Sequence, residues 1–117
     1  MSKPVVGAQL FSVRQHTQTM PEIAESLKRI ADIGYTAVQV SGFGKVDYRD
    51  VASAVKDAGL TVAATHISWA DCLNDLSGVI EKHKAWDCRH VAIGGLPGEY
   101  GGAEGLKKFL DELPPVA

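Results

Sequence analysis

The sequence predicts an α/β fold made of four successive strand–helix units. Two observations support this prediction: four short, almost continuously apolar segments, and segments between and after them with apolar residues at helical spacing. Strands that alternate with helices pair in parallel through right-handed crossovers, so we expect one parallel sheet in a single domain over residues 1–117. The predicted strands are about 5–11, 36–42, 60–68 and 90–96.

The first two helices are predicted from their ends. Thr19 and Glu22 have the spacing of a capping box, and Gly34 supplies the left-handed residue that commonly ends a helix. The second helix is expected to begin near Asp47 and to end at Gly59. Apolar residues recur between these ends at spacings of three and four, which predicts one buried face on each helix.

The third and fourth helices are predicted from periodicity. The third is expected over 71–85 as one helix, with these residues facing inward: Leu73, Leu76 and Ile80. The fourth is expected over 103–113, with one apolar face made by Leu106, Phe109, Leu110 and Leu113. Pro114 and Pro115 are expected to end it, because proline lacks the N–H that a helix needs.

Two architectures satisfy this order of elements. One is half of a (β/α)8 TIM barrel, whose complete form has roughly 250 residues. The other is a small doubly wound parallel sheet. Periodicity alone does not distinguish them.

Composition and charge exclude several classes. The net charge is −2 and no basic stripe is present, so no nucleic-acid partner is expected. No apolar run approaches the roughly 18 residues of a membrane helix, and the start is too short for a signal peptide. The sequence therefore predicts a cytoplasmic protein without a membrane partner, with Cys72 and Cys88 as free thiols.

Polar side chains stand at the carboxyl ends of the predicted strands, where parallel α/β proteins bind ligands. The residues at these ends are Gln9 on the first strand, Gln39, Ser41 and Gly42 on the second, and His66, Ser68 and the aromatic Trp69 on the third. Neutral amides and hydroxyls match sugar oxygens, and an aromatic ring covers C–H surface, so we predict a hydroxyl-rich ligand. The alternative is that these groups satisfy backbone polar groups or pack in the core.

Several common sites are missing from the sequence. The glycine-rich segment 94–102 has neither G-x-G-x-x-G spacing nor the lysine of a P-loop, so no nucleotide site is expected. No G-x-S-x-G motif is present, and neither cysteine is placed as a nucleophile. No cluster of carboxylates and histidines at the strand ends is suited to a divalent metal.

Four segments in order, VGAQLFSVRQ, GYTAVQVSGFG, GLTVAATHISW and HVAIGGLPGEYGGAEGLKKFLDEL, resemble the N-terminal half of sugar phosphate isomerase/epimerase proteins. This family belongs to the xylose isomerase-like barrel superfamily, which also includes apurinic endonucleases. The resemblance covers essentially the whole chain. It implies that His66 faces the substrate cleft, and that Gln9, Ser41 and Gly42 line it.

The resemblance also implies a divalent metal (Mn, Mg, Co or Zn), held in the complete enzyme by Glu, Asp, His and Glu on strands five to eight. We expect those strands, and the catalytic carboxylates on them, to be absent from this chain, so it alone holds no metal and no catalytic residue. The predicted function is therefore the N-terminal part of a metal-dependent sugar (phosphate) isomerase/epimerase that supplies one wall of the cleft and is inactive in isolation. Its expected partners are a small sugar and either a missing C-terminal half or a second copy.

Two further functions remain open. The first is a non-catalytic scaffold in which the half-barrel associates with itself, because four strands leave two sheet edges uncovered. The second is phosphodiester cleavage, as in the endonuclease branch. That branch needs a metal-binding histidine on strand four, where this chain has Gly94 and Gly95.

Overall fold

The computed structural model describes residues 3–117, so the first two residues of the predicted domain lie outside it. These residues contain one sheet of four parallel strands in the order of the chain: β1 (Gly7–Gln9), β2 (Ala37–Val40), β3 (Thr61–Ile67) and β4 (Val91–Ile93). The α-helices are α1 (Met20–Ile33), α2 (Tyr48–Asp57), α3 (Trp69–Asn74), α4 (Leu76–Ala85) and α5 (Gly102–Val116). Two short 3-10 segments are η1 (Leu10–His16) and η2 (Gly98–Tyr100). Among the described residues, no helix is long and apolar enough to cross a membrane.

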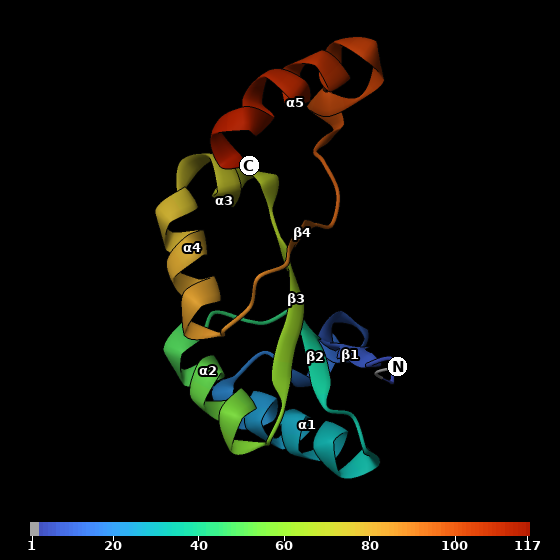
Figure 1. The fold of residues 1–117 in the computed structure, drawn as a ribbon, viewed down its shortest axis with the longest axis vertical. Helices are drawn as coiled ribbons and strands as arrows, with labels where there is room; N and C mark the ends of the chain where they lie inside the picture. The colour runs from blue at the N-terminus through green and yellow to red at the C-terminus, as the bar shows by residue number, and fades with distance from the viewer. Residues whose placement is uncertain (1–2) are drawn as a thin grey trace.

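The strand order distinguishes the two predicted architectures. Every crossover moves one strand in the same direction, and successive helices touch one another, α1 against α2 and α2 against α4. Figure 1 shows α2 and α4 along the same side of β3. A doubly wound sheet reverses its strand order and places helices on both faces. The α/β prediction is therefore confirmed, and the doubly wound alternative is wrong.

The main core lies between the sheet and these helices. Val38 and Val40 of β2 point into it, as does Val62 of β3. Each such side chain contributes about 1.5–3 kcal/mol when fully buried. The helices supply the other core residues: Ile23, Leu27 and Ile30 from α1, with Val51 and Val55 from α2.

The first two helices begin as predicted. The Thr19 hydroxyl accepts the Glu22 N–H (3.4 Å) and donates to the Glu22 carboxylate (3.0 Å). Gly34 ends α1 with φ of 119°, which favours glycine. Asp47 caps α2, and hydrogen bonds from the Arg49 side chain and backbone hold the pKa of Asp47 below its usual value.

The third predicted helix is two helices. Asp75 has φ of −141°, which is not helical, and its carboxylate caps α4 by accepting the Gly78 N–H (3.3 Å). The break turns α4 relative to α3, so the inner face differs from the predicted one. Leu73 is 39% exposed and Ile80 is 46% exposed, while the side chains buried from this segment are Trp69, Cys72, Val79 and His83.

The fourth helix is longer than predicted. It continues through Pro114 and Pro115, and the Ala117 N–H donates to the Leu113 carbonyl (2.9 Å). The fixed φ of proline is compatible with a helix, although each proline removes one hydrogen bond of the last turn. Of the predicted apolar face, Phe109 and Leu113 pack inward, whereas Leu106 and Leu110 are exposed.

Candidate functional site

The face of the sheet opposite the helices carries polar side chains, and we call it the open face. On β2, Val38 and Val40 are buried against helices, so Gln39 between them points to the open face. Gln9 is the register partner of Gln39 on β1 and points the same way. Neighbouring strands lie about 4.8 Å apart, so the two amides are within reach of one ligand.

A register shift sets the orientation of β3. Val38 pairs with Val62, but Gln39 pairs with Ala64, so β3 has one extra residue at this point. Ala64 therefore shares the open face with Gln39, and His66, two residues further, lies there too. Without the shift, simple alternation from Val62 would turn His66 toward the helices.

A buried hydrogen-bonded pair on the helix side fixes the same orientation. The Thr65 hydroxyl lies 2.6 Å from Nε2 of His83, and Nδ1 of His83 lies 2.7 Å from the Val79 carbonyl. A carbonyl only accepts, so in the neutral ring Nδ1 donates to it and Nε2 accepts the Thr65 hydroxyl. Since Thr65 is anchored among the helices, His66 is held on the open face.

His66 is exposed at the carboxyl end of β3. Its register partner on β4 is Ala92, and a Cβ at Gly94 would lie 3.4 Å from Nδ1 of His66. Glycine thus leaves the side of the imidazole open toward β4. We call Gln9, Gln39, His66 and Gly94 the open rim.

Ser41 and Gly42 lie behind this rim. Ser41 is only 6% exposed, and its hydroxyl accepts the Phe11 N–H (3.2 Å) and donates to Oε1 of Gln39 (2.7 Å). Gly42 has φ of 73°, and a Cβ there would lie 2.9 Å from the Phe11 ring. Both residues support the rim by joining β2 to η1.

The loops after β1 and β2 are hydrogen-bonded to each other. Gln18 donates through Nε2 to the Gly42 carbonyl (2.9 Å), and the Gly44 N–H donates to the Thr17 carbonyl (3.1 Å). Thr17 is buried and its hydroxyl donates to the Arg14 carbonyl (3.3 Å). These bonds hold the loops in one arrangement beside Gln9 and Gln39.

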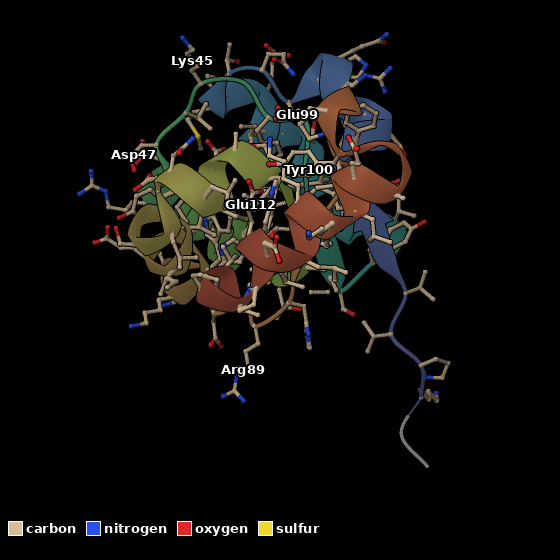
Figure 2. The ribbon with its side chains drawn as sticks, turned by 90° about the horizontal axis from the view of Figure 1, so that it is seen from above. Lys45, Asp47, Arg89, Glu99, Tyr100 and Glu112 are labelled. Atoms are coloured by element: carbon tan, nitrogen blue, oxygen red, sulfur yellow. The ribbon has the colours of Figure 1, made fainter. Side chains whose placement is uncertain are left out.

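Trp69 is part of a second core cluster beneath α5. Its side chain is 1% exposed, its ring lies 4.9 Å from that of Phe109, and Nε1 donates to Glu112 (3.1 Å). The Tyr100 hydroxyl donates to the same carboxylate oxygen (2.6 Å). In Figure 2, Tyr100 and Glu112 lie close together at α5. Because its side chain is buried in this cluster, Trp69 presents no surface to a ligand at the open rim.

The Glu112 carboxylate predicts an acid-sensitive contribution to stability. Hydrogen bonds from Tyr100 and then Trp69 hold the pKa of Glu112 below its usual 4.5. Such a group stabilises the fold above the unfolded-state pKa and loses this effect as the pH falls through the folded-state pKa. We therefore expect the urea midpoint to fall on acidification below pH 4.5, and to fall less in a Glu112→Gln variant. Equal acid sensitivity of both proteins would contradict this role of Glu112.

The contribution of Tyr100 to stability is expected to be lost at high pH, not at low pH. Its hydrogen bond to Glu112 raises the pKa of Tyr100 above the usual 10.0. Its contribution is therefore present below that value and is lost as the pH rises through the folded-state pKa. The ultraviolet absorbance of tyrosinate, compared between the native chain and the Tyr100→Phe variant, measures this shift.

The described residues contain no cluster suited to hold a metal ion, and Cys72 is not activated as a nucleophile. Among residues 3–117, no three histidine, cysteine or acidic side chains come together in a way that could hold a metal ion. The open rim offers one imidazole and neutral amides, which is too few ligands for a divalent cation. Burial, and then the charge of Asp71, raise the pKa of the Cys72 thiol, which disfavours the reactive thiolate.

A cavity lies at the opposite end of the sheet. It has a volume of about 930 Å³ and is lined at the amino ends of β2 and β3 by residues that include Lys56, Thr61 and His90. In parallel α/β folds, ligand chemistry occurs at the carboxyl ends of the strands. The open rim, not this cavity, is therefore the candidate site.

Comparison with solved structures decides the architecture. A sugar phosphate isomerase/epimerase from Parabacteroides distasonis superposes with a TM-score of 0.74 and 18% identity, over 97% of this chain and 49% of that one. The fold is half of a (β/α)8 barrel. An AP endonuclease, family 2, from Brucella melitensis matches with a TM-score of 0.56 and 19% identity, over 97% of this chain and 52% of that one. This chain thus spans about half the length of the solved chains it matches. No protein-family model and no curated protein matches it.

The half-barrel brings together some of the predicted site residues. Gln9, Gln39 and His66 share the open face, whereas Ser41 and Gly42 support it. Sequence reasoning missed the partner of Trp69, since Glu112 is 43 residues away and no local pattern links the two.

Proposed function

We propose that the chain forms the N-terminal half of a barrel enzyme that isomerises or epimerises a sugar or sugar phosphate, and that its open rim is one wall of the substrate cleft. The observation that carries the proposal is the exposed His66 beside Gln9 and Gln39 at the carboxyl end of the sheet. An imidazole and two amides are suited to hold sugar hydroxyls.

Catalysis in this proposal depends on groups outside the described residues. Isomerisation or epimerisation needs a base that removes a proton from carbon and an electrophile that stabilises the resulting oxyanion. A complete enzyme would obtain these from a divalent metal and from carboxylates in its other half. The residues here bind and orient the sugar, and the isolated chain is inactive. We place the protein in the cytoplasm, on the support of its two free cysteines.

The role of His66 is tested by sugar binding to the isolated chain. We expect His66→Ala to weaken the binding of D-glucose or D-fructose, followed by NMR titration, by about 3- to 10-fold, the loss of one hydrogen bond. His90→Ala, at the amino end of β4, is the matched control and should leave binding unchanged. Equal affinity of His66→Ala and the native chain would contradict the proposal. Turnover by the native chain with Mn²⁺ or Mg²⁺ would contradict its inactivity.

A second candidate function is a self-associating scaffold. It is favoured by exposed apolar side chains beside both outer strands, with Val5 at 70% and Ile33 at 76% near β1, and Val91 at 46% on β4. Within the described residues, β1 and β4 each pair on one side only. Two copies could close both edges in one barrel. Size-exclusion chromatography with light scattering tests this: a dimer without sugar binding favours the scaffold, and a monomer rules it out.

A further inference from the structure

Gln39 is held differently from its neighbour on the open rim. Gln9 is exposed, so its amide can turn to present either its oxygen or its nitrogen to a ligand. Gln39 is half-buried, and its Oε1 already accepts a 2.7 Å hydrogen bond from Ser41. One lone pair of this amide oxygen is therefore already used, and the amide is held in one orientation.

Ser41 is hydrogen-bonded on two sides. The Phe11 N–H donates to the Ser41 hydroxyl oxygen at 3.2 Å. The Ser41 hydroxyl in turn donates its proton to Oε1 of Gln39 at 2.7 Å. In this arrangement the amide oxygen of Gln39 faces Ser41, and the amide nitrogen is turned away from it. The burial of Ser41 limits competition by water.

The nitrogen of Gln39 is consequently left for a ligand. Among residues 3–117, no buried side-chain polar atom lacks a hydrogen-bond partner. Nε2 of Gln39 has no partner within these residues, so this group reaches solvent. It presents N–H donors to a ligand, while Oε1 of the same amide is held by Ser41.

We propose that Gln39 is a specificity-determining residue that meets the sugar through its N–H donors, and that Ser41 is the positioning residue that fixes it. The position then selects a sugar oxygen that acts as an acceptor, such as a carbonyl or a hydroxyl lone pair. This inference rests on the proposed function, since it assigns one polar contact within the same cleft.

The test compares two series of analogues of D-glucose, measured by NMR titration of the full chain. Monodeoxyfluoro sugars retain a weak acceptor at one position, whereas monodeoxy sugars retain neither acceptor nor donor. At the position that meets Gln39, we expect the deoxy analogue to bind about 3- to 10-fold more weakly than D-glucose and the fluoro analogue to fall between them. In Ser41→Ala the amide is free to turn, so the advantage of the fluoro analogue over the deoxy analogue should shrink. Ser41→Thr keeps the hydroxyl and should keep the native pattern.

Substitutions of Gln39 complete the test. Gln39→Glu replaces the donors by acceptors and should bind the fluoro analogue at the critical position no better than the matching deoxy one. Gln39→Met retains the length of the side chain without its polar atoms and should bind D-glucose and the critical deoxy analogue equally, which tests the inference without touching buried Ser41.

The outcomes separate the two proposals. If no sugar binds the native chain, the proposed function fails and this inference fails with it. If sugars bind and the analogue pattern is the same in the native chain, Gln39→Met and Ser41→Ala, the inference alone is overturned.

Discussion

Replacing Gly44 by alanine is expected to separate the loops after β1 and β2 and to remove sugar binding by the open rim. A Cβ at Gly44 would overlap the backbone carbonyl group of Gln18, which cannot turn away as a side chain would. The backbone must move, and the 3.1 Å hydrogen bond from Gly44 to buried Thr17 is lost with it. Overpacking of this kind costs about 1–3 kcal/mol in the free energy of unfolding.

Urea unfolding measures this loss, and an NMR titration with D-glucose measures the binding. Gly95→Ala is the matched control, because a Cβ there meets no atom within 4 Å. It lies in the loop after β4 and should leave both quantities close to native. If Gly44→Ala unfolds at the native midpoint and binds sugar normally, the pairing of these loops does not support the rim.

The sequence predicted features that depend on neighbouring residues. Thr19 and Gly34 define the ends of α1 through contacts within one turn, and the structure places both as expected. The break at Asp75 was missed, although its cause is also local. The apolar residues of this segment keep a spacing of three and four across Asp75, so a prediction from spacing alone gives one continuous helix. The aspartate that caps a second helix does not change that spacing.

The orientation of His66 illustrates what the sequence could not show. Its side chain faces the open side because the pairing of β3 with β2 skips one residue of β3 between Val62 and Ala64. Nothing in the run of small and β-branched residues marks this shift, since alanine fits both faces. The position depends on pairing with β2, and the Thr65–His83 contact that holds it joins β3 to α4.

The sequence also could not distinguish the residues that face the ligand from those that support them. Ser41 and Gln39 are two apart on one strand, which predicts a shared direction. In the structure, Ser41 is buried behind the rim and acts on Gln39, because η1 folds back to place the Phe11 N–H against it. Polar residues at strand ends identify the region of a site, and the loops decide which of them meet the ligand.

Replacing Trp69 by alanine is expected to destabilise the chain by about 3–5 kcal/mol and to release α5 from the half-barrel. Trp69 is among the largest fully buried side chains of the described residues, and its ring packs against Phe109 of α5 at 4.9 Å. Its loss also leaves Glu112 with Tyr100 as its one remaining donor in this cluster. Urea unfolding gives the free energy, and hydrogen exchange should show faster exchange in α5 than in α1.

Trp69→Phe separates packing from ligand binding. Phenylalanine keeps an aromatic ring against Phe109 but loses the second ring of the indole and the N–H that reaches Glu112. A loss smaller than that of Trp69→Ala, about 1–3 kcal/mol, is therefore expected. Sugar binding should be native, because Trp69 is buried beneath α5 and presents no surface to a ligand. A Trp69→Phe variant that is folded and stable yet fails to bind D-glucose would show that the indole touches the sugar, as the sequence pattern first indicated. Native affinity would place Trp69 with the residues that hold the fold.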